Sequence, residues 1–201
     1  MKHSKIYHFV GLSMLTALVV VLQTIGGGIS FGGFSITLVL IPVVIGSALF
    51  GPKDGAFLGG VFGLIAYINS ANGTDPWGNM VFTANPFLCA LVCIGKGALA
   101  GLAAGFLYKW IYGAFAKKTT AGSYIAVIGA AIIAPVVNTG TFILGMLLFF
   151  KGTLDSWAGG TPILSYIIFG LTGINFLIEL GVNLVLAPAI TTIINVIRKK
   201  N

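Results

Sequence analysis

Two ionisable side chains, Lys96 and Glu179, stand inside long apolar segments of this 201-residue sequence. Ionisable groups are costly inside a membrane, tend to face the protein interior and indicate a functional site. Asn138 lies in another such segment, and Asn175, Glu179 and Asn183 repeat every four residues, so they share one face of a helix. At a rise of ~1.5 Å per residue, Lys96, Asn138 and Glu179 are expected roughly 10–18 Å below one end of their helices. The pattern predicts a small-molecule pocket that is mostly apolar and has a few polar groups.

Two structural explanations compete with a ligand pocket. Lys96 and Glu179 would also be explained as an ion pair that only holds helices together. The asparagines would also be explained as interhelical hydrogen bonds, which are common in membrane bundles. Polar side chains on three helices at similar depth, beneath polar loops, favour the pocket, but these explanations remain open.

The composition indicates an integral membrane protein. Only 7% of the residues are charged and 57% are hydrophobic, whereas soluble domains carry about 25% charged residues. Apolar runs that approach the ~20 residues needed to cross a bilayer recur along the chain. The basic residues behind the net charge of +7 mostly stand beside these runs. They are therefore better explained by the orientation of the protein in the membrane than by nucleic-acid binding. We expect residues 1–201 to form a single transmembrane domain.

The sequence lacks the motifs of the common enzymes. It contains no Walker A lysine loop, no HExxH, no Gly-x-Ser-x-Gly and no clustered acidic metal site. Cys89 and Cys93 lie four residues apart on one predicted helix face, and we interpret them as small packing residues, not as a metal site or a disulfide. The prediction is a protein that is not an enzyme and that has no catalytic residues, no metal and no cofactor of its own.

The apolar pattern predicts an all-α bundle of six transmembrane helices. The expected spans are residues 6–25, 36–50, 56–70, 86–112, 124–150 and 174–197. Residues 51–55 are a turn signal, residues 26–35, 69–85 and 151–161 are expected loops, and 162–173 contains a short interfacial piece. Nine of the eleven Lys and Arg residues fall at the two termini and in the 51–55 and 109–118 regions. The positive-inside rule therefore places both termini in the cytoplasm.

Small residues repeat at intervals of four in two of the spans. Ser13 and Ala17 do so in the first span, and Gly59 and Gly63 do so in the third. Such rows let helices approach closely. They are expected either to pack the bundle internally or to dock another membrane subunit.

Three stretches carry a resemblance to a known family. ALFGPKDGAFLGGVFGLI (48–65), KGALAGLAAGFLYK (96–109) and APVVNTGTFILGMLLFF (134–150), in a chain of six expected spans, resemble the S-components of energy-coupling factor (ECF) vitamin transporters. The NTGTFILGMLLFF run is most similar to the pantothenate-type members. The resemblance implies a multi-pass protein of a prokaryotic plasma membrane that captures a vitamin at its external side.

The resemblance also implies where the ligand binds. In this family the substrate is enclosed by the loops after the first, third and fifth helices and by the outer halves of the last three. In this sequence those regions contain a glycine-rich gating loop and a set of polar or aromatic residues: Gly26, Gly27, Gly28, Gly32 and Gly33 in the loop, and Trp77, Asn85, Lys96, Asn138, Asn175, Glu179 and the neighbouring Asn183 around the pocket.

The implied partners are a transmembrane coupling subunit and two ATPase subunits, which use the ATP. Family members dock through small residues of the first helix, here Ser13 and Ala17, with Ser13 standing where an alanine is expected. If the ligand is pantothenate, Lys96 is expected to bind its carboxylate. Rival ligands are folate, riboflavin or a thiamine precursor, for which Trp77, Phe82 or Trp157 would offer stacking. A structural protein without a ligand is the remaining alternative.

Overall fold

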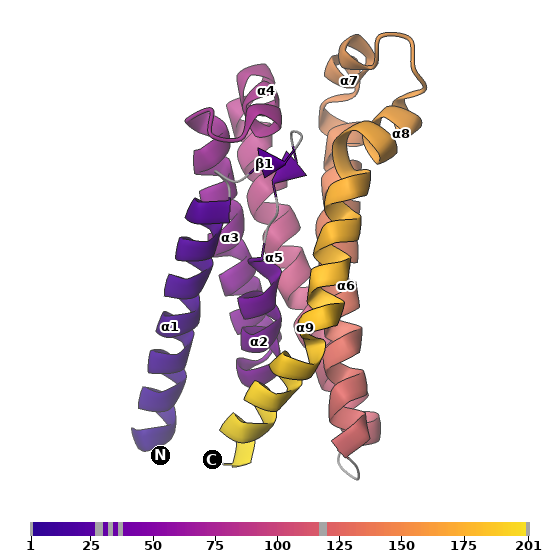
Figure 1. Ribbon diagram of the computed structural model, residues 1–201. Helices are drawn as coiled ribbons and strands as arrows, with labels where there is room; N and C mark the ends of the chain where they lie inside the picture. Colours follow the sequence, from indigo (N-terminus) through magenta and orange to yellow (C-terminus); the bar gives the residue numbers. More distant parts are fainter. Residues whose placement is uncertain (1, 27–29, 32–33, 36–37, 117–119, 200–201) are drawn as a thin grey trace.

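The chain forms an elongated bundle of helices with both termini at one end (Figure 1). The computed structural model describes residues 2–26, 30–31, 34–35, 38–116 and 120–199. Its helices are α1 (Lys2–Gly26), α2 (Leu40–Phe50), α3 (Pro52–Ala71), α4 (Pro76–Ala84), α5 (Pro86–Ile111), α6 (Thr120–Phe149), α7 (Lys151–Ala158), α8 (Ile163–Ser165) and α9 (Gly173–Lys199), with π-helical segments η1 (Tyr112–Ala116) and η2 (Tyr166–Thr172). The short strands β1 (Ser30–Phe31) and β2 (Phe34–Ser35) pair antiparallel.

Four helices among the described residues are long and apolar enough to cross a membrane. They comprise Lys5–Gly26, Pro86–Phe115, Ala121–Phe149 and Asn175–Ile197, which correspond to the first, fourth, fifth and sixth predicted spans. Their outer faces carry exposed large hydrophobic side chains such as Phe9, Phe106 and Val185, as contact with lipid requires. The all-helical membrane architecture and these spans are confirmed.

The second and third predicted spans differ from this pattern. α2 has 11 residues, a length of about 16 Å, which is too short to cross a bilayer by itself. Most of its residues are buried, which explains why its sequence is hydrophobic all round. α3 has 20 residues and begins earlier than predicted, because Pro52 occupies its first turn. The chain reverses direction between α2 and α3 at Gly51 alone, whose φ of 107° suits glycine.

Two predicted loops contain helices instead. The 69–85 stretch includes α4, and the 151–161 stretch is largely α7. Each short helix buries an apolar residue, Val81 in α4 and Leu154 in α7, and both belong to one apolar cluster with Met146. The prediction of loops was wrong here because the polar composition of these segments hides an apolar face. The short piece predicted within 162–173 is present as α8 and η2.

A row of glycines joins α3 to α5. We call it the glycine seam, and it consists of Gly55, Gly59, Gly63, Gly97, Gly101 and Gly105. A Cβ atom on Gly59 would collide with the carbonyl group of Gly97, and a Cβ atom on Gly101 would collide with that of Gly55. The two backbones are therefore in direct contact, and the prediction that Gly59 and Gly63 pack the bundle internally is confirmed.

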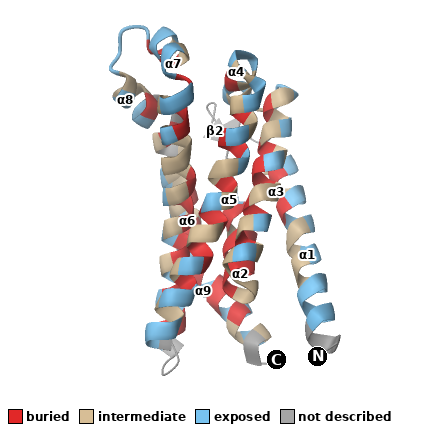
Figure 2. Ribbon diagram, turned by 180° about the vertical axis from the view of Figure 1, so that it is seen from behind, coloured by how far each residue is buried: buried red, intermediate tan, exposed pale blue. Residues whose placement is uncertain are grey.

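Helix α1 lies at the edge of the bundle and is largely exposed (Figure 2). Ser13 and Ala17 both belong to its exposed surface. Near the end of the bundle that holds both chain termini, His8 Nε2 lies 3.1 Å from Asp54 Oδ2 of α3. At the other end, Asn69 Nδ2 donates to the carbonyl oxygen of Gln23, at 3.5 Å. α1 is thus tied to α3 near both ends, and Ser13 and Ala17 remain accessible to lipid or to another protein.

Candidate ligand-binding site

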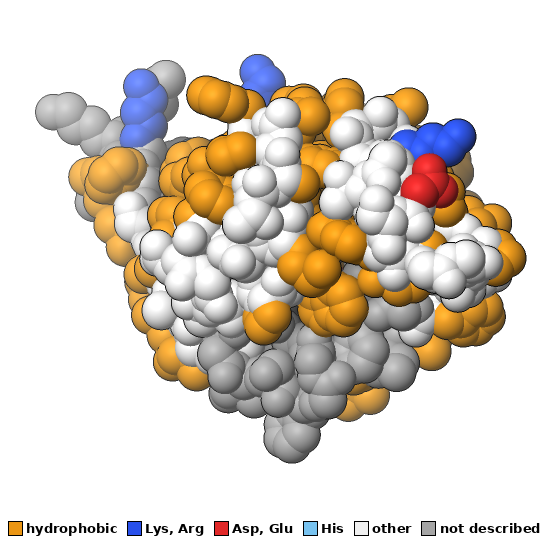
Figure 3. All heavy atoms as spheres, turned by 90° about the horizontal axis from the view of Figure 1, so that it is seen from above, with side chains coloured by type: hydrophobic (Ala, Val, Ile, Leu, Met, Phe, Trp, Pro, Cys, Tyr) orange, Lys and Arg blue, Asp and Glu red, His pale blue; other side chains and the backbone are white. Residues whose placement is uncertain are grey.

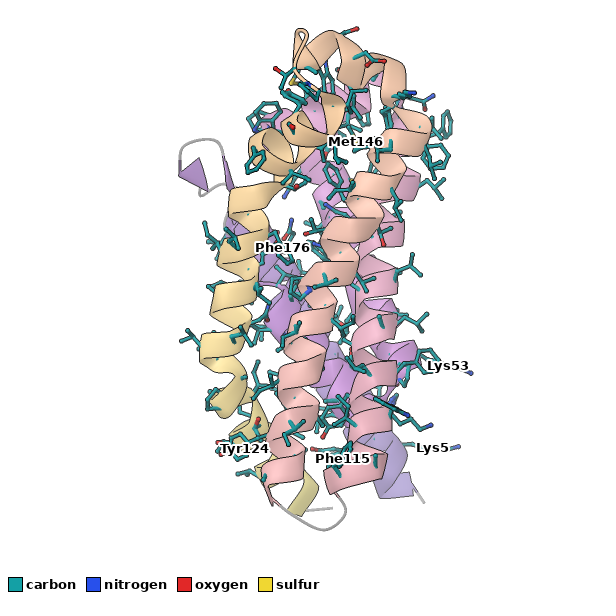
Figure 4. The ribbon with its side chains drawn as sticks, turned by 90° about the vertical axis from the view of Figure 1, so that its right-hand side faces the viewer. Lys5, Lys53, Phe115, Tyr124, Met146 and Phe176 are labelled. Carbon is teal, nitrogen blue, oxygen red and sulfur yellow. The ribbon has the colours of Figure 1, made fainter. Side chains whose placement is uncertain are left out.

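A cavity of about 140 Å³ lies between α1, α3, α4, α5, α6 and α9, at the end of the bundle opposite the termini. Five residues predicted from the sequence are in its wall: Trp77, Lys96, Asn138, Asn175 and Glu179. Helices far apart in the chain therefore bring these side chains to one place. Viewed from this end, the described surface shows hydrophobic side chains between areas of other uncharged side chains and backbone, with few charged groups (Figure 3). In Figure 4, Met146 marks this end, and Lys5 and Lys53 mark the opposite one.

Lys96 of α5 holds its ammonium group over two aromatic rings. Lys96 Nζ lies 5.0 Å from the ring centroid of Phe142 and 6.0 Å from that of Phe62. Both rings also line the cavity. Cation–π contacts of this kind are favourable and leave an ammonium free to donate hydrogen bonds. The cavity wall therefore contains an ammonium group together with the carboxyl groups of Asp75 and Glu179.

The amide side chains of the cavity present oxygen atoms that lack partners. Asn138 is 6% exposed and Gln23 is 5% exposed. The side-chain oxygens of Gln23, Asn138 and Asn175 are buried without a hydrogen-bond partner among the described residues. A buried acceptor that is left unsatisfied costs about 1–3 kcal/mol. A ligand with hydroxyl or N–H donors would satisfy these acceptors.

Glu179 is buried in the cavity wall, but Asn183, one turn further along α9, is not part of the described wall. Asn183 Nδ2 donates to the backbone carbonyl oxygen of Glu179 at 2.9 Å. Glu179 and Asn183 lie on one face of α9, as their spacing of four residues predicted. The cavity, however, ends at the level of Glu179. The structure thus places Asn183 in the helix packing below the cavity, and its contact with the ligand stays a prediction.

Asn85, which was also predicted to contact the ligand, has a structural role at the start of α5. Its side-chain oxygen accepts a hydrogen bond from the backbone N–H of Leu88 at 3.1 Å, which makes it the N-cap of α5. Asn85 is not in the described cavity wall. The residue type and its place just before Pro86 are typical of a helix start, and this signal competes with the interpretation as a ligand contact.

Replacing Asn85 by alanine is expected to lower the free energy of unfolding by about 1 kcal/mol and to leave ligand affinity unchanged. Thermal unfolding and a binding titration on the same protein check both. Asn85→Ser, which retains an N-cap oxygen, is the matched control and should unfold like the wild type. Loss of affinity without loss of stability in Asn85→Ala would return Asn85 to the binding site.

The predicted gating loop is mostly outside the described residues. Gly26 is the last residue of α1, whereas Gly27, Gly28, Gly32 and Gly33 lie outside the described part of the chain. The flanking strands pair Ser30 with Ser35 and Phe31 with Phe34. The gating role of these glycines stays a prediction.

Several wall residues were not named as site residues from the sequence. Asn69, Ser70 and Asp75 belong to the 69–85 stretch that was expected to enclose the substrate, whereas Gln23, Thr139 and Thr172 lie outside it. Gln23 carried the same signal as Asn138, because it is a single amide in an apolar run (LTALVVVLQTIG). Cys89 and Cys93 are free thiols in this wall, buried against the apolar cluster of Met146. Their predicted place on one helix face agrees with the structure.

Comparison with known proteins assigns the chain to a family. Residues 9–191 match the family described as "ECF transporter, substrate-specific component". The chain is also 31% identical over 196 residues, 94% of each chain, to a protein named "Pantothenic acid transporter PanT" from Lactococcus lactis subsp. cremoris (strain MG1363). With its long apolar helices, the chain is a multi-pass prokaryotic membrane protein and not an enzyme. It belongs to the family of substrate-specific components of ECF transporters.

Proposed function

We propose that this protein captures pantothenate at the outer face of the membrane and delivers it to an ECF transport module. The observation that carries the proposal is one cavity that holds a lysine ammonium together with unpartnered amide oxygens, in a chain 31% identical to a pantothenic acid transporter. Lys96 would bind the carboxylate of pantothenate. Asn138, Asn175 and Glu179 would accept hydrogen bonds from its hydroxyl groups and amide N–H.

This function requires the end of the bundle that holds the cavity to face the outside of the cell. Both termini would then lie in the cytoplasm. The termini share one end of the bundle with Lys5 and Lys53, and Lys109 lies in the last turn of α5 at the same end. In the sequence, further basic residues stand next to these segments, at 117–118 and 198–200, as the positive-inside rule expects of a cytoplasmic end. In this arrangement α2 and α3 complete a six-helix, single-domain membrane bundle, with α2 inserted among the other helices.

Transport would require partners that this chain lacks. A transmembrane coupling subunit and two ATPases, which would use the ATP, are proposed from the family. Ser13 and Ala17 on the exposed face of α1 are the proposed contact with the coupling subunit. Small side chains on a lipid-facing helix would permit close approach of a partner helix.

Native mass spectrometry of the detergent-purified protein tests the substrate. We expect pantothenate bound one to one, and a titration of the ligand-free protein should show saturable binding. A different vitamin, for example an aromatic one stacked on Trp77, would overturn pantothenate and retain the capture function. An empty protein that binds no member of a vitamin panel would contradict the capture function.

A further inference from the structure

Gln23 is a buried amide on the helix that is otherwise the most exposed of the long helices. It is 5% exposed, and Oε1 has no hydrogen-bond partner in the described part of the structure. It is the residue that α1 contributes to the described cavity wall. A buried glutamine oxygen without a hydrogen-bond partner is costly in a membrane span unless something else satisfies it.

The backbone of Gln23 contacts α3, and its side chain lines the cavity. Its carbonyl oxygen accepts from Asn69 Nδ2 of α3 at 3.5 Å, and Asn69 is a wall residue too. The next residue, Thr24, is exposed and bonds to the Val20 carbonyl of its own helix at 2.8 Å. The turn thus presents one amide to the cavity and one hydroxyl away from it.

The polar groups of the cavity match the groups of the proposed substrate. The three unpartnered amide oxygens, from Gln23, Asn138 and Asn175, come from α1, α6 and α9. Pantothenate carries two hydroxyls and an amide N–H, which are three donors, besides the carboxylate that Lys96 would bind. Asn138, Asn175 and Glu179 offer acceptors from α6 and α9, and Gln23 offers the acceptor on the α1 side of the cavity.

We propose that Gln23 Oε1 accepts a hydrogen bond from a hydroxyl of the bound substrate, and that this contact makes the site select ligands with a donor on the α1 side. The inference rests on the proposed capture of pantothenate and adds a specificity-determining residue to it. An acceptor at this position favours a hydroxyl over a hydrogen atom, because the amide oxygen would otherwise stay buried and unsatisfied.

Gln23→Met tests the contact, because methionine keeps the length of the side chain and removes the amide. Affinities would be measured by titration for pantothenate and for its two deoxy analogues, each with one hydroxyl replaced by hydrogen. We expect Gln23→Met to bind pantothenate about tenfold to a hundredfold more weakly than the wild type, as for one lost buried hydrogen bond. For one of the two analogues the wild type and the variant should bind equally.

The controls separate binding from structure. Thr24→Val, on the same turn but facing away from the cavity, should bind like the wild type. Without ligand, Gln23→Met should be at least as stable as the wild type, because an unsatisfied acceptor has been removed. Wild-type affinity for pantothenate, an equal loss for both analogues, or unfolding of the ligand-free variant would each overturn the role of Gln23.

The binding of pantothenate by the wild type distinguishes a failure of the proposed function from a failure of the role of Gln23. If the wild type does not bind pantothenate, the proposed substrate is wrong whatever Gln23 does. The wild type and Gln23→Met would then be compared on the vitamin that co-purifies. Equal affinities, or no retained vitamin, would overturn the role of Gln23 as well.

Discussion

Replacing Lys96 by methionine is expected to weaken pantothenate binding by about a hundredfold or more. The variant removes the ammonium group and keeps an unbranched side chain against Phe62 and Phe142. The substrate carboxylate would then be buried without a cation, and removing one partner of a buried charge pair costs about 3–5 kcal/mol. Since each 1.4 kcal/mol is a factor of ten, the loss should be easily measured by titration.

An uncharged analogue isolates the contribution of the carboxylate. The alcohol in which a hydroxymethyl group replaces the carboxylate should lose little affinity between the wild type and Lys96→Met. Lys109→Met, a lysine in the last turn of the same helix and outside the described cavity wall, is the matched control. A Lys96→Met protein that no longer folds would favour the alternative in which Lys96 and Glu179 form a structural ion pair. Unchanged affinity for pantothenate would exclude Lys96 from the site.

Substitution in the glycine seam should have the largest effect on stability. Gly59→Leu is expected to prevent α3 and α5 from packing, because its first side-chain carbon would already collide with the backbone of Gly97. The smaller change Gly59→Ala should lower the free energy of unfolding by about 1–3 kcal/mol, as for an overpacked interior. A backbone carbonyl cannot rotate away as a side chain does, so the helices themselves would have to separate.

The adjacent glycine provides the control for this prediction. A Cβ atom on Gly60 meets nothing within 4 Å. Gly60→Ala should therefore leave the protein as stable as the wild type, or raise its stability by roughly 0.5–1 kcal/mol through the better helix propensity of alanine. Thermal unfolding in detergent, followed by size-exclusion chromatography of each variant, makes the comparison. Equal stability of Gly59→Ala and Gly60→Ala would contradict the close backbone contact.

The long helices could be predicted from the sequence because the thickness of the bilayer imposes a length on their apolar runs. The fourth span, predicted over 86–112, is α5 (Pro86–Ile111), and the fifth, predicted over 124–150, lies within α6 (Thr120–Phe149) but for Phe150. α4 and α7 could not be recognised in the same way. Their stability comes from one or two apolar residues that pack on the bundle, and such short patterns are hidden in polar sequence.

The cavity was partly predictable for a related reason. Lys96, Asn138 and Glu179 stand out because each is a polar residue surrounded by apolar ones. That signal finds buried polar groups but does not say what they contact. It therefore included Asn183, which bonds within α9, and the same reasoning passed over Gln23 near the end of its span. Only the packing of the helices decides which of these side chains reach the cavity.

The repeat of the glycine seam has a consequence for the alignment of α3 with α5. In the structure Gly55 meets Gly101 and Gly59 meets Gly97. If α5 slid by four residues, about 6 Å, Gly55, Gly59 and Gly63 would face Gly105, Gly101 and Gly97, so glycine spacing alone admits a second register.

Contacts near the other end of the bundle distinguish the two registers. Ser47 Oγ donates to the Gly101 carbonyl at 3.0 Å, and Pro52 packs where a side chain on Gly105 would stand. A slide of one turn would bring the equivalent carbonyl of Gly105 to Ser47, but it would also move Pro52 toward the large side chain of Tyr108. The depth of Lys96 in the cavity is therefore set far from the cavity, by the contact of Pro52 with Gly105.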